Sequence, residues 1–312
     1  MVTYEPVKPY KQTILELIRT TWETQYVSVR PGTYPVIQKK FSFPEVDHTD
    51  GIGTKGVYHW RAGTFRNAVL DSLAMNLNDL AVMRAVPYKL QDHLTVPKED
   101  ERVLEVMRAL VAECQQRQIA ITGGENSFQD TLDGMDLSIT MSGFLRRERQ
   151  NRFERGDVLI GMPSNGLHSN GFTKVRQVFG GEARPEFTEP TRIYHDAIMA
   201  LDEHMDIHGM AHITGGAYTK LKELLPSGCG IRIHRDHSLR PQSIFFDLHR
   251  KGILDEDMYK TFNCGIGFIF SVSPDDAAKA TDGSDLAVIG EIIADDNVIK
   301  IESFFSEREA VF

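Results

Sequence analysis

Hydrophobic residues along this chain recur with two periods, one typical of helices and one typical of strands. Where apolar positions return every three or four residues, they fall on one face of a helix. Helices are therefore predicted over residues 11–23, 63–85 and 98–118. Short apolar runs bounded by turn residues indicate strands. They predict two strands within residues 25–46 and further strands at 86–96, 119–122 and 137–145.

The second half of the chain continues this alternation. It predicts strands at residues 158–161 and 298–304, helices near 171–179 and 190–204, and a short apolar run at 210–214 followed by a helix. Between the halves, residues 146–155 (RRERQNRFER) have no apolar period, and we interpret them as a solvated connector rather than a binding patch. The pattern predicts an α/β (α+β) protein with two domains, residues 1–150 and 151–312.

Composition narrows the class of protein. The chain has 312 residues and is 41% hydrophobic, which is enough for a sizeable core. No apolar run approaches the about 20 residues that cross a bilayer, and no basic segment followed by an apolar stretch indicates a signal peptide. The net charge of -9 argues against a general nucleic-acid-binding surface, although a local cationic pocket remains compatible with it.

The three cysteines predict a reducing environment. Cys114, Cys229 and Cys264 are far apart and odd in number, so they indicate neither a disulfide framework nor a CxxC metal motif. We therefore expect a cytoplasmic protein. From the missing apolar span and the negative net charge, we also expect that it contacts neither membrane nor nucleic acid.

The segment at residues 50–56, Asp-Gly-Ile-Gly-Thr-Lys-Gly, is the strongest candidate for chemistry. Glycines let a backbone approach a ligand closely, lysine matches a phosphate, and aspartate matches a hard cation such as Mg²⁺. A tight turn between strands is the alternative, because DG is a common hairpin signal. Taken alone, the segment leaves both interpretations open.

Polar residues on the predicted helix 63–85 add to this candidate site. Asp71 and Asn78 are two helical turns apart and share a face, and Asp79 follows directly. An otherwise apolar helix holds such groups where they cap, pair or bind something. With Asp50 they can form an oxygen-rich magnesium site, and a hydrogen-bonded contact between helices is the alternative.

Two histidines lie in loops suited to ligand binding. His168 lies in a loop rich in Ser, Asn and Gly, and His212 precedes a glycine pair. Either can hold a phosphate or exchange a proton near neutral pH, or be structural. The sequence Ile-Thr-Gly-Gly occurs at both 121–124 and 213–216, which predicts two strand ends that present backbone N–H groups to anions.

Several enzyme classes are disfavoured by the absence of their motifs. The chain has no G-x-S-x-G nucleophile elbow, no GxxxxGK[ST] P-loop, no GxGxxG fingerprint and no close zinc-ligand spacing. A serine hydrolase, a P-loop enzyme and a zinc enzyme are therefore poor interpretations.

Taken together, the motifs resemble the aminoimidazole ribonucleotide synthetase family, the phosphoribosylformylglycinamidine cyclo-ligases of purine biosynthesis. The matching stretches occur in the family's order at residues 49–56, 70–87, 121–125, 156–172, 190–194, 211–226 and 258–270. The pieces NDL, GGE and the glycine loop are shared with a wider group of ATP-using enzymes, whereas LHSNG, AHITGG and TFNCG are more specific.

The resemblance implies a fold and an activity. The fold has an N-terminal ATP-binding α/β domain whose sheet pairs with that of a second subunit in a barrel-like dimer core. A C-terminal α/β domain completes the substrate cleft. The implied reaction converts ATP and formylglycinamidine ribonucleotide to aminoimidazole ribonucleotide, ADP and phosphate, with the formyl oxygen leaving as phosphate after ring closure. ATP and Mg²⁺ are implied, and a need for K⁺ is left open.

The resemblance also implies roles for individual residues. It implies catalytic roles for Lys55, Asp79, His168 and His212. It implies Mg²⁺ contacts at Asp50, Asp71 and Asp79. It implies ATP contacts at Asp50, Gly51, Gly53, Thr54, Lys55, Asn78 and Asp79. It implies substrate contacts at Gly123, Gly124, Glu125, Asn126, Ser169, Asn170, Thr214, Gly215 and Gly216.

Three segments depart from the family's pattern. Residues 25–46 contain only Gly32 where the family usually has a glycine-rich segment, residues 126–130 replace a Thr-Ala-Glu-Met-Pro sequence, and Ala217 follows Gly215-Gly216 in place of a third glycine. These departures keep two alternatives open. One is a related ATP-dependent kinase or synthetase for another small molecule. The other is a catalytically silent nucleotide-binding homologue.

Overall fold

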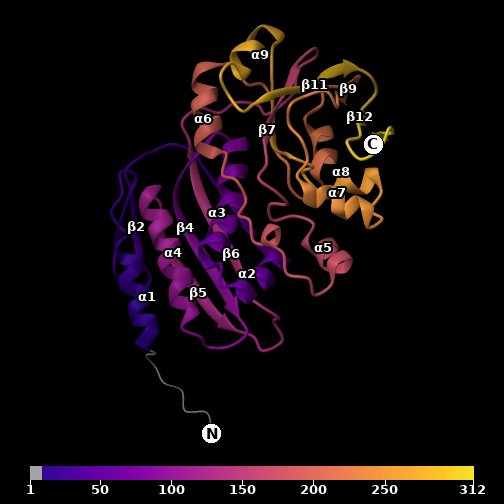
Figure 1. The fold of residues 1–312 in the computed structure, drawn as a ribbon. Helices are drawn as coiled ribbons and strands as arrows, with labels where there is room; N and C mark the ends of the chain where they lie inside the picture. The colour runs from indigo at the N-terminus through magenta and orange to yellow at the C-terminus, as the bar shows by residue number, and fades with distance from the viewer. Residues whose placement is uncertain (1–8) are drawn as a thin grey trace. The chain divides into compact units, whose positions relative to one another are not determined.

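The computed structural model describes residues 9–312, and these divide into two compact units (Figure 1). Unit 1 contains the described residues up to Asn76 together with Ala85–Arg146, and unit 2 contains Leu77–Arg84 and Arg147–Phe312. The chain therefore passes from the first unit into the second within one helix, returns, and crosses again at Arg146, inside the predicted connector.

Unit 1 is built on a four-stranded mixed sheet. Its strands are β3 (Glu45–Gly51), β4 (Ala85–Val96), β5 (Ala120–Phe128) and β6 (Asp136–Leu145). Their order is β3-β6-β4-β5, with β4 and β5 parallel and the other pairs antiparallel. A separate hairpin pairs β1 (Val27–Arg30) with β2 (Val36–Lys39).

Helices of unit 1 are α1 (Pro9–Arg19), α2 (Gly56–Ala62), α3 (Phe65–Val82) and α4 (Arg102–Gln116). Helix α1 contacts α4, and both contact β5 (Figure 1). Along β4, Leu90 and Leu94 are buried while Gln91 and His93 are exposed. Since strand side chains alternate between faces, the first pair marks the core face and the second the open face of the sheet.

Unit 2 is built on a seven-stranded sheet. Its strands are β7 (Val158–Pro163), β8 (Met210–His212), β9 (Cys229–Ile233), β10 (Ile266–Val272), β11 (Ala287–Ala294), β12 (Ile299–Glu302) and β13 (Glu309–Val311). Their order is β13-β12-β9-β11-β7-β10-β8. The helices are α5 (Phe172–Phe179), α6 (His195–His204), α7 (Ser243–Arg250), α8 (Asp255–Thr261) and α9 (Pro274–Thr281).

The core of unit 2 explains why the end of α3 belongs to it. Every residue of β10 is buried. Ala81 of α3 packs in the same hydrophobic cluster as Phe268 and Phe270 of β10 and Ile198 of α6. The side chain of Arg84 donates to Asp202 (3.0 Å) in the same unit. Apolar packing and a buried ion pair thus hold residues 77–84 in unit 2.

The predicted mixed α/β class is confirmed, and most predicted elements occur within a few residues of their expected bounds. Four details differ. Strand β5 continues to Phe128 past its predicted end at residue 122, so Gly123 and Gly124 lie within the strand and not at a strand end. Helix α2 was not predicted, because its seven residues are too few to reveal a helical period. The helix expected from residue 190 begins at His195, and the helix expected after Gly216 is the 3₁₀ segment η3 (Ala217–Leu224).

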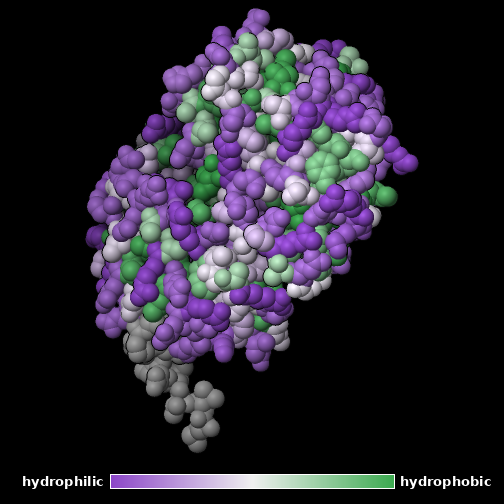
Figure 2. Space-filling model, viewed as in Figure 1, coloured by the Kyte–Doolittle hydropathy of each residue, from purple (hydrophilic) through white to green (hydrophobic). Residues whose placement is uncertain are grey.

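On the face drawn in Figure 2, hydrophobic residues form small, separate groups among hydrophilic ones. Exposed aromatic residues include Tyr34 in the loop between β1 and β2, and Phe43 after β2. Within residues 9–312, no helix combines the length and the apolar character that a membrane span needs.

Candidate functional site

The glycine-rich segment joins the end of β3 to α2. Strand β3 ends at Gly51, the 3₁₀ turn η1 covers Gly53–Lys55, and α2 begins at Gly56. A Cβ atom at residue 56 would lie 1.9 Å from the carbonyl oxygen of Met135, so only glycine fits there. Asp50 is half-buried, and its Oδ1 accepts a hydrogen bond from the Gly51 N–H (2.7 Å).

Lys55, at the end of this segment, lies in a fully buried charged group. Its Nζ lies 2.9 Å from Oδ1 and 2.8 Å from Oδ2 of Asp71 on α3. His59 of α2 is paired with the same carboxylate, with Nε2 2.7 Å from Oδ2. All three side chains have no exposed surface.

The charges of this group compensate one another. Burial alone would raise the pKa of Asp71, but the positive charge of Lys55 and the hydrogen bond from His59 lower it to about 2. Burial lowers the pKa of His59, against the hydrogen bond to Asp71. A buried charge is tolerated when it is paired and hydrogen-bonded, as here. These contacts place Lys55 and Asp71 in the interior of unit 1; their predicted phosphate and metal roles stay predictions.

Unit 1 also contains a cavity of about 810 Å³ beside β5. It is lined by Gly123, Gly124, Glu125 and Asn126, the four predicted substrate contacts of this unit. Side chains of α1, including Ile18, line it as well. Small-molecule sites commonly have volumes of about 300–1,000 Å³, so a nucleotide fits by size.

Two acceptor oxygens beside this cavity lack a hydrogen-bond partner among the described residues. They are Oδ1 of Asn126 and Oδ1 of Asp92, both on residues that line the cavity. Burial raises the pKa of the Asp92 carboxyl to about 7. A buried polar atom without a partner is costly, and a bound ligand with N–H groups would remove that cost.

In unit 2, the end of α3 meets β8 through a hydrogen-bonded chain. Nδ1 of His212 lies 3.1 Å from Oδ1 of Asp79, and Nε2 lies 3.1 Å from Nδ2 of Asn78. The side chain of His212 has no exposed surface, whereas that of Asp79 is 27% exposed. His212 is 133 positions from Asp79 and 134 positions from Asn78 in sequence, and the fold brings the three together. All three are predicted site residues.

Other predicted residues lie in the loops of the same unit. His168 has a positive φ of 59°, and its Nε2 lies 3.0 Å from Oδ1 of Asn165. The hydroxyls of Ser169 and Thr191 lie 3.0 Å apart. Nζ of Lys220 donates to the hydroxyl of Thr214 (3.0 Å).

Gly215 lies beside Asn170, because a Cβ atom at residue 215 would be 3.7 Å from Oδ1 of Asn170. Gly216 adopts a φ of 79° before η3. The structure therefore joins the loop at residues 168–170 to the one at residues 214–216 within unit 2.

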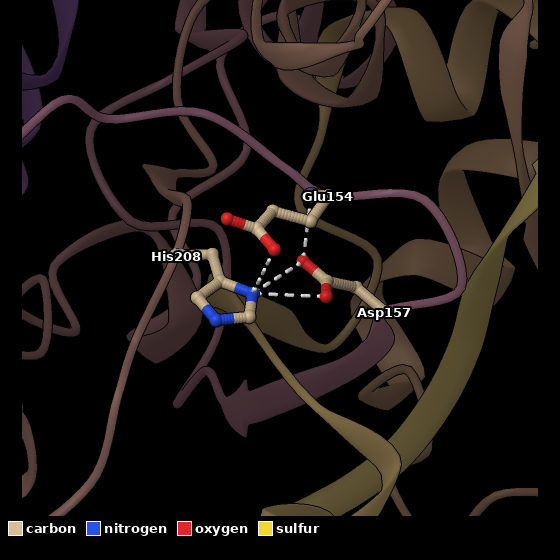
Figure 3. A group of neighbouring side chains, drawn as sticks. All are labelled: Glu154, Asp157 and His208. Carbon is tan, nitrogen blue, oxygen red and sulfur yellow. Dashed lines mark hydrogen bonds and ion pairs between the residues drawn. The ribbon is translucent and has the colours of Figure 1, made fainter.

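A further group, Glu154, Asp157 and His208, was not singled out from the sequence (Figure 3). Nδ1 of His208 lies 2.9 Å and 3.1 Å from the two carboxylate oxygens of Asp157. Oδ2 of Asp157 also accepts from the hydroxyl of Ser271 (2.7 Å) and from the Glu154 N–H (2.8 Å). Since both oxygens of Asp157 already accept protein hydrogen bonds, this group ties the start of β7 to the segment before β8.

Asp92 is the candidate that sequence reasoning missed. A signal was present, because Leu90, Asp92 and Leu94 alternate along one strand and so share its buried face. A carboxylate at a buried strand position needs a partner or a function.

Comparison with known proteins agrees with this architecture. Residues 45–145 match the N-terminal domain of the AIR synthase related proteins, and residues 154–301 match the C-terminal domain. The chain belongs to the AIR synthase related family. Both matched segments fall within the sequence halves that the pattern of hydrophobic residues predicts as domains.

Members of this family with assigned names resemble the chain over most of its length. A phosphoribosylformylglycinamidine cyclo-ligase of Methanobrevibacter smithii is 32% identical over 312 residues, which cover 92% of this chain and 91% of that protein. One of Thermococcus gammatolerans is 35% identical over 248 residues, which cover 74% and 73%. The predicted family is thereby confirmed.

Solved structures show the same fold at low identity. HypE of E. coli, a hydrogenase maturation protein, has a TM-score of 0.68 at 16% identity, covering 97% of this chain and 96% of its own. A HypE solved with ATP has a TM-score of 0.65 at 13% identity, covering 98% and 94%. The AIR synthase-like fold of this chain is thereby established.

Proposed function

We propose that the protein converts formylglycinamidine ribonucleotide and ATP to aminoimidazole ribonucleotide, ADP and phosphate, as a step of purine biosynthesis. The relatives named cyclo-ligases support this proposal. The observation that carries it in this chain is the cavity beside β5, because two of the residues that line it each have a buried acceptor oxygen without a hydrogen-bond partner among the described residues. An amidine offers N–H donors, which is the complement those oxygens need.

In this proposal, the residues that line the cavity bind the amidine of the substrate and fix its orientation. Asn126 accepts an N–H of the amidine through Oδ1, and Glu125, its neighbour in β5, pairs with the positive charge of the amidine. Asp92 of the neighbouring strand β4 accepts a second N–H. Holding the amidine in one orientation presents one nitrogen to the formyl carbon, which is how positioning lowers a ring-closure barrier.

ATP supplies the group that turns the formyl oxygen into a phosphate leaving group. We propose Asp50 of unit 1 and Asp79 of unit 2 each as a contact to Mg²⁺ or to the phosphates, because both residues have exposed surface. Gly51, Gly53 and Thr54 would supply backbone contacts beside Asp50. Asp71 does not fit this set, since both of its oxygens accept from the buried ammonium of Lys55 and Oδ2 is also paired with His59. We infer that Lys55 and Asp71 instead fix the glycine-rich segment against α3.

In unit 2, the loops at residues 168–170 and 214–216 are proposed to hold the sugar phosphate of the substrate. The contact of Lys220 with Thr214 supports this, because it brings a cation to a glycine-rich loop. The backbone N–H groups of Gly215 and Gly216 and the side chains of Ser169 and Asn170 would complete the cradle. His168 stays a candidate for proton transfer in this loop.

We also propose a homodimer in the cytoplasm. The resemblance implies pairing through the sheet of unit 1, whose open face carries the exposed side chains of Gln91 and His93. All three cysteines are free and buried, in keeping with a reducing compartment. Light scattering should report the mass of two chains, and a mass of one chain at micromolar concentration would contradict the dimer.

The activity is tested by incubating purified protein with formylglycinamidine ribonucleotide, ATP and Mg²⁺. We expect one phosphate and one ADP for each aminoimidazole formed, with the aminoimidazole detected by diazotisation. The assay should be repeated with and without K⁺. ADP release that occurs without any aminoimidazole would refute cyclisation while leaving phosphoryl transfer in place.

A second candidate is a related ATP-dependent kinase or synthetase for another small molecule. The altered residues 126–130 favour it, because Asn126 itself lines the cavity and residues 127 and 128 continue the same strand β5. A screen of small-molecule acceptors by ADP release separates it from the cyclo-ligase. Calorimetry that detects ATP binding without hydrolysis in any mixture would favour the catalytically silent homologue.

A further inference from the structure

Asn78 is fully buried, and each of its hydrogen-bonding groups is used. Its Oδ1 accepts the backbone N–H of Tyr194 (2.7 Å). Its Nδ2 donates to the carbonyl oxygen of Arg192 (3.0 Å) and lies 3.1 Å from Nε2 of His212. A carboxamide has one acceptor oxygen and two N–H donors, so all of its capacity is accounted for.

These contacts determine the orientation of the amide. The N–H of Tyr194 can only donate, so the atom facing it is the amide oxygen, and the carbonyl of Arg192 can only accept, so the atom facing it is the amide nitrogen. The second N–H of Asn78 therefore points at Nε2 of His212. Ring nitrogens and amide orientations are assigned from such networks, and here the two backbone groups leave one solution.

The amide in turn determines which ring nitrogen of His212 carries the proton. Nε2 receives an N–H from Asn78 and must act as an acceptor. Nδ1 then carries the ring proton and donates it to Oδ1 of Asp79 (3.1 Å). The ring packs at 6.3 Å from Phe268 and 6.4 Å from Tyr194, measured between ring centroids, which limits its rotation.

We propose that Asn78 and His212 are positioning residues for Asp79. Asn78 fixes the tautomer of His212, and His212 holds the Asp79 carboxylate in one orientation through Nδ1–H. The inference rests on the proposed function for the role of Asp79 as a contact to Mg²⁺ or phosphate. A carboxylate that is held in one orientation binds a ligand with less loss of side-chain freedom than a mobile one.

This role differs from proton transfer by His212, which the sequence resemblance implies. Both ring nitrogens make hydrogen bonds within unit 2, and the side chain has no exposed surface. Asp79, the last member of this series of hydrogen bonds, is the residue that has exposed surface. His212 therefore acts on bound ligands through Asp79. Asn78 does not contact ATP directly, because it is also fully buried and all its hydrogen-bonding groups are used.

The tautomer is measured directly on the ligand-free protein. Two-bond ¹H–¹⁵N correlation spectra of ¹⁵N-histidine-labelled protein, with His212 assigned by its loss in His212→Asn, report which ring nitrogen bears the proton. We expect a protonated Nδ1 and an unprotonated Nε2. A proton on Nε2 would overturn the inference, and this result does not depend on any activity.

Two substitutions separate the ring nitrogens by function. An asparagine amide nitrogen reaches the position of Nδ1, and a glutamine amide nitrogen reaches the position of Nε2. We expect His212→Asn, which keeps a donor toward Asp79, to retain at least about tenfold more kcat than His212→Gln. A tenfold ratio corresponds to about 1.4 kcal/mol of transition-state free energy. Equal losses in both variants, with both folded by circular dichroism, would contradict a positioning role.

Failure of the proposed function is recognised separately. If the wild-type protein shows no turnover with formylglycinamidine ribonucleotide, the same pair of variants is compared by calorimetry with MgADP. Tighter binding by His212→Asn than by His212→Gln would uphold the inference, and equal binding would refute it. If neither variant folds, His212 is assigned in the wild-type protein from its sequential backbone correlations, and its tautomer decides.

Discussion

Helix α3 supplies side chains to two buried polar groups that differ in one respect. In unit 1, Asp71 pairs with Lys55 and His59, and no atom of the three side chains reaches the surface. In unit 2, Asn78 and His212 are equally buried, but their hydrogen bonds lead to Asp79, which is 27% exposed. The first group has no exposed side chain, whereas the second includes a carboxylate that a ligand can reach.

The comparison shows that residue type alone does not separate a structural carboxylate from a functional one. Asp71 and Asp79 lie eight residues apart on one helix and were predicted to bind the same metal. Their surroundings differ, because one faces a buried lysine and the other faces a histidine whose remaining nitrogen is fixed by an amide. We therefore expect substitutions in the first group to affect stability and those in the second to affect turnover.

The largest effect is expected for Lys55→Met. It leaves the Asp71 carboxylate buried without its cation, and breaking a buried ion pair in this way costs about 3–5 kcal/mol. Urea denaturation followed by circular dichroism measures the loss in free energy of unfolding.

Arg61→Met is the matched control on α2. The Arg61–Asp133 pair is exposed on both sides, so its loss should cost less than about 1 kcal/mol. If Lys55→Met unfolded like the wild-type protein but bound ATP more weakly, Lys55 would be a phosphate ligand and the comparison would fail.

Asp92→Asn should change the pH dependence of stability. Burial raises the pKa of Asp92 to about 7 in the folded state, above its value of about 4 in an unfolded chain. The folded state therefore holds the proton more tightly, and the stability from this group is present at low pH and lost as the pH rises toward 7.

The variant should consequently gain stability over the wild-type protein between pH 4 and pH 7. Three pKa units correspond to at most about 4 kcal/mol. Urea midpoints at pH 4, 5.5 and 8, without ligand, measure the difference. Asp133→Asn, at an exposed position, is the control and should show no comparable trend. A constant difference across this range would mean that Asp92 keeps an ordinary pKa.

Asp79→Asn should reduce turnover by more than roughly tenfold, because an anionic oxygen at a proposed Mg²⁺ contact is lost. Its free energy of unfolding should change little, since the side chain is partly exposed and α3 is otherwise intact. Steady-state kinetics at several Mg²⁺ concentrations, together with urea denaturation, separate the two. Glu203→Gln, at an exposed position on α6, is the control. Wild-type kinetics in Asp79→Asn would remove this residue from the site.

The smallest effect is expected for Glu154, in the group of Figure 3. Glu154 is 69% exposed, so Glu154→Gln should change the free energy of unfolding by less than about 0.5 kcal/mol. Asp157→Asn should cost about 1–3 kcal/mol, because an amide nitrogen replaces one of the two oxygens that accept from the Ser271 hydroxyl and from His208. Thermal unfolding of each variant, with and without Zn²⁺, measures these two changes in stability. A melting temperature that rises with Zn²⁺ in the wild-type protein, and not in Glu154→Gln, would show a metal site instead.

Helices with a clear stripe were predictable, and short elements were not. The apolar positions of α4, among them Val103, Met107 and Leu110, repeat with a helical period and are buried as expected. Helix α2 contains only seven residues, and the residues of η3 follow a 3₁₀ rather than an α-helical path. In such segments tertiary contacts outweigh local preference, as they do where Gly56 packs against Met135.

The sequence predicted most residues of the candidate site, but it did not predict which of them contact one another. The motifs gave Gly123 to Asn126 and the pair Asn78 and Asp79, and the structure places the former at a cavity and the latter against His212. They did not include Asp92, whose signal was its place between Leu90 and Leu94 in the alternation of a buried strand face and not a motif. Nor could they reveal that Lys55 and Asp71 neutralise each other.

By itself the sequence determined the mixed α/β class, the family and the residue types at the site, because periodicity and motif spacing are local properties of the chain. Tertiary structure alone decided which carboxylate is buried against a cation, which acceptors lie beside a cavity, and which nitrogen of His212 bears a proton. Each of these depends on atoms that lie up to 134 positions apart in sequence. Burial, hydrogen bonding and pKa are set by neighbours in space, and those neighbours exist only once the chain has folded.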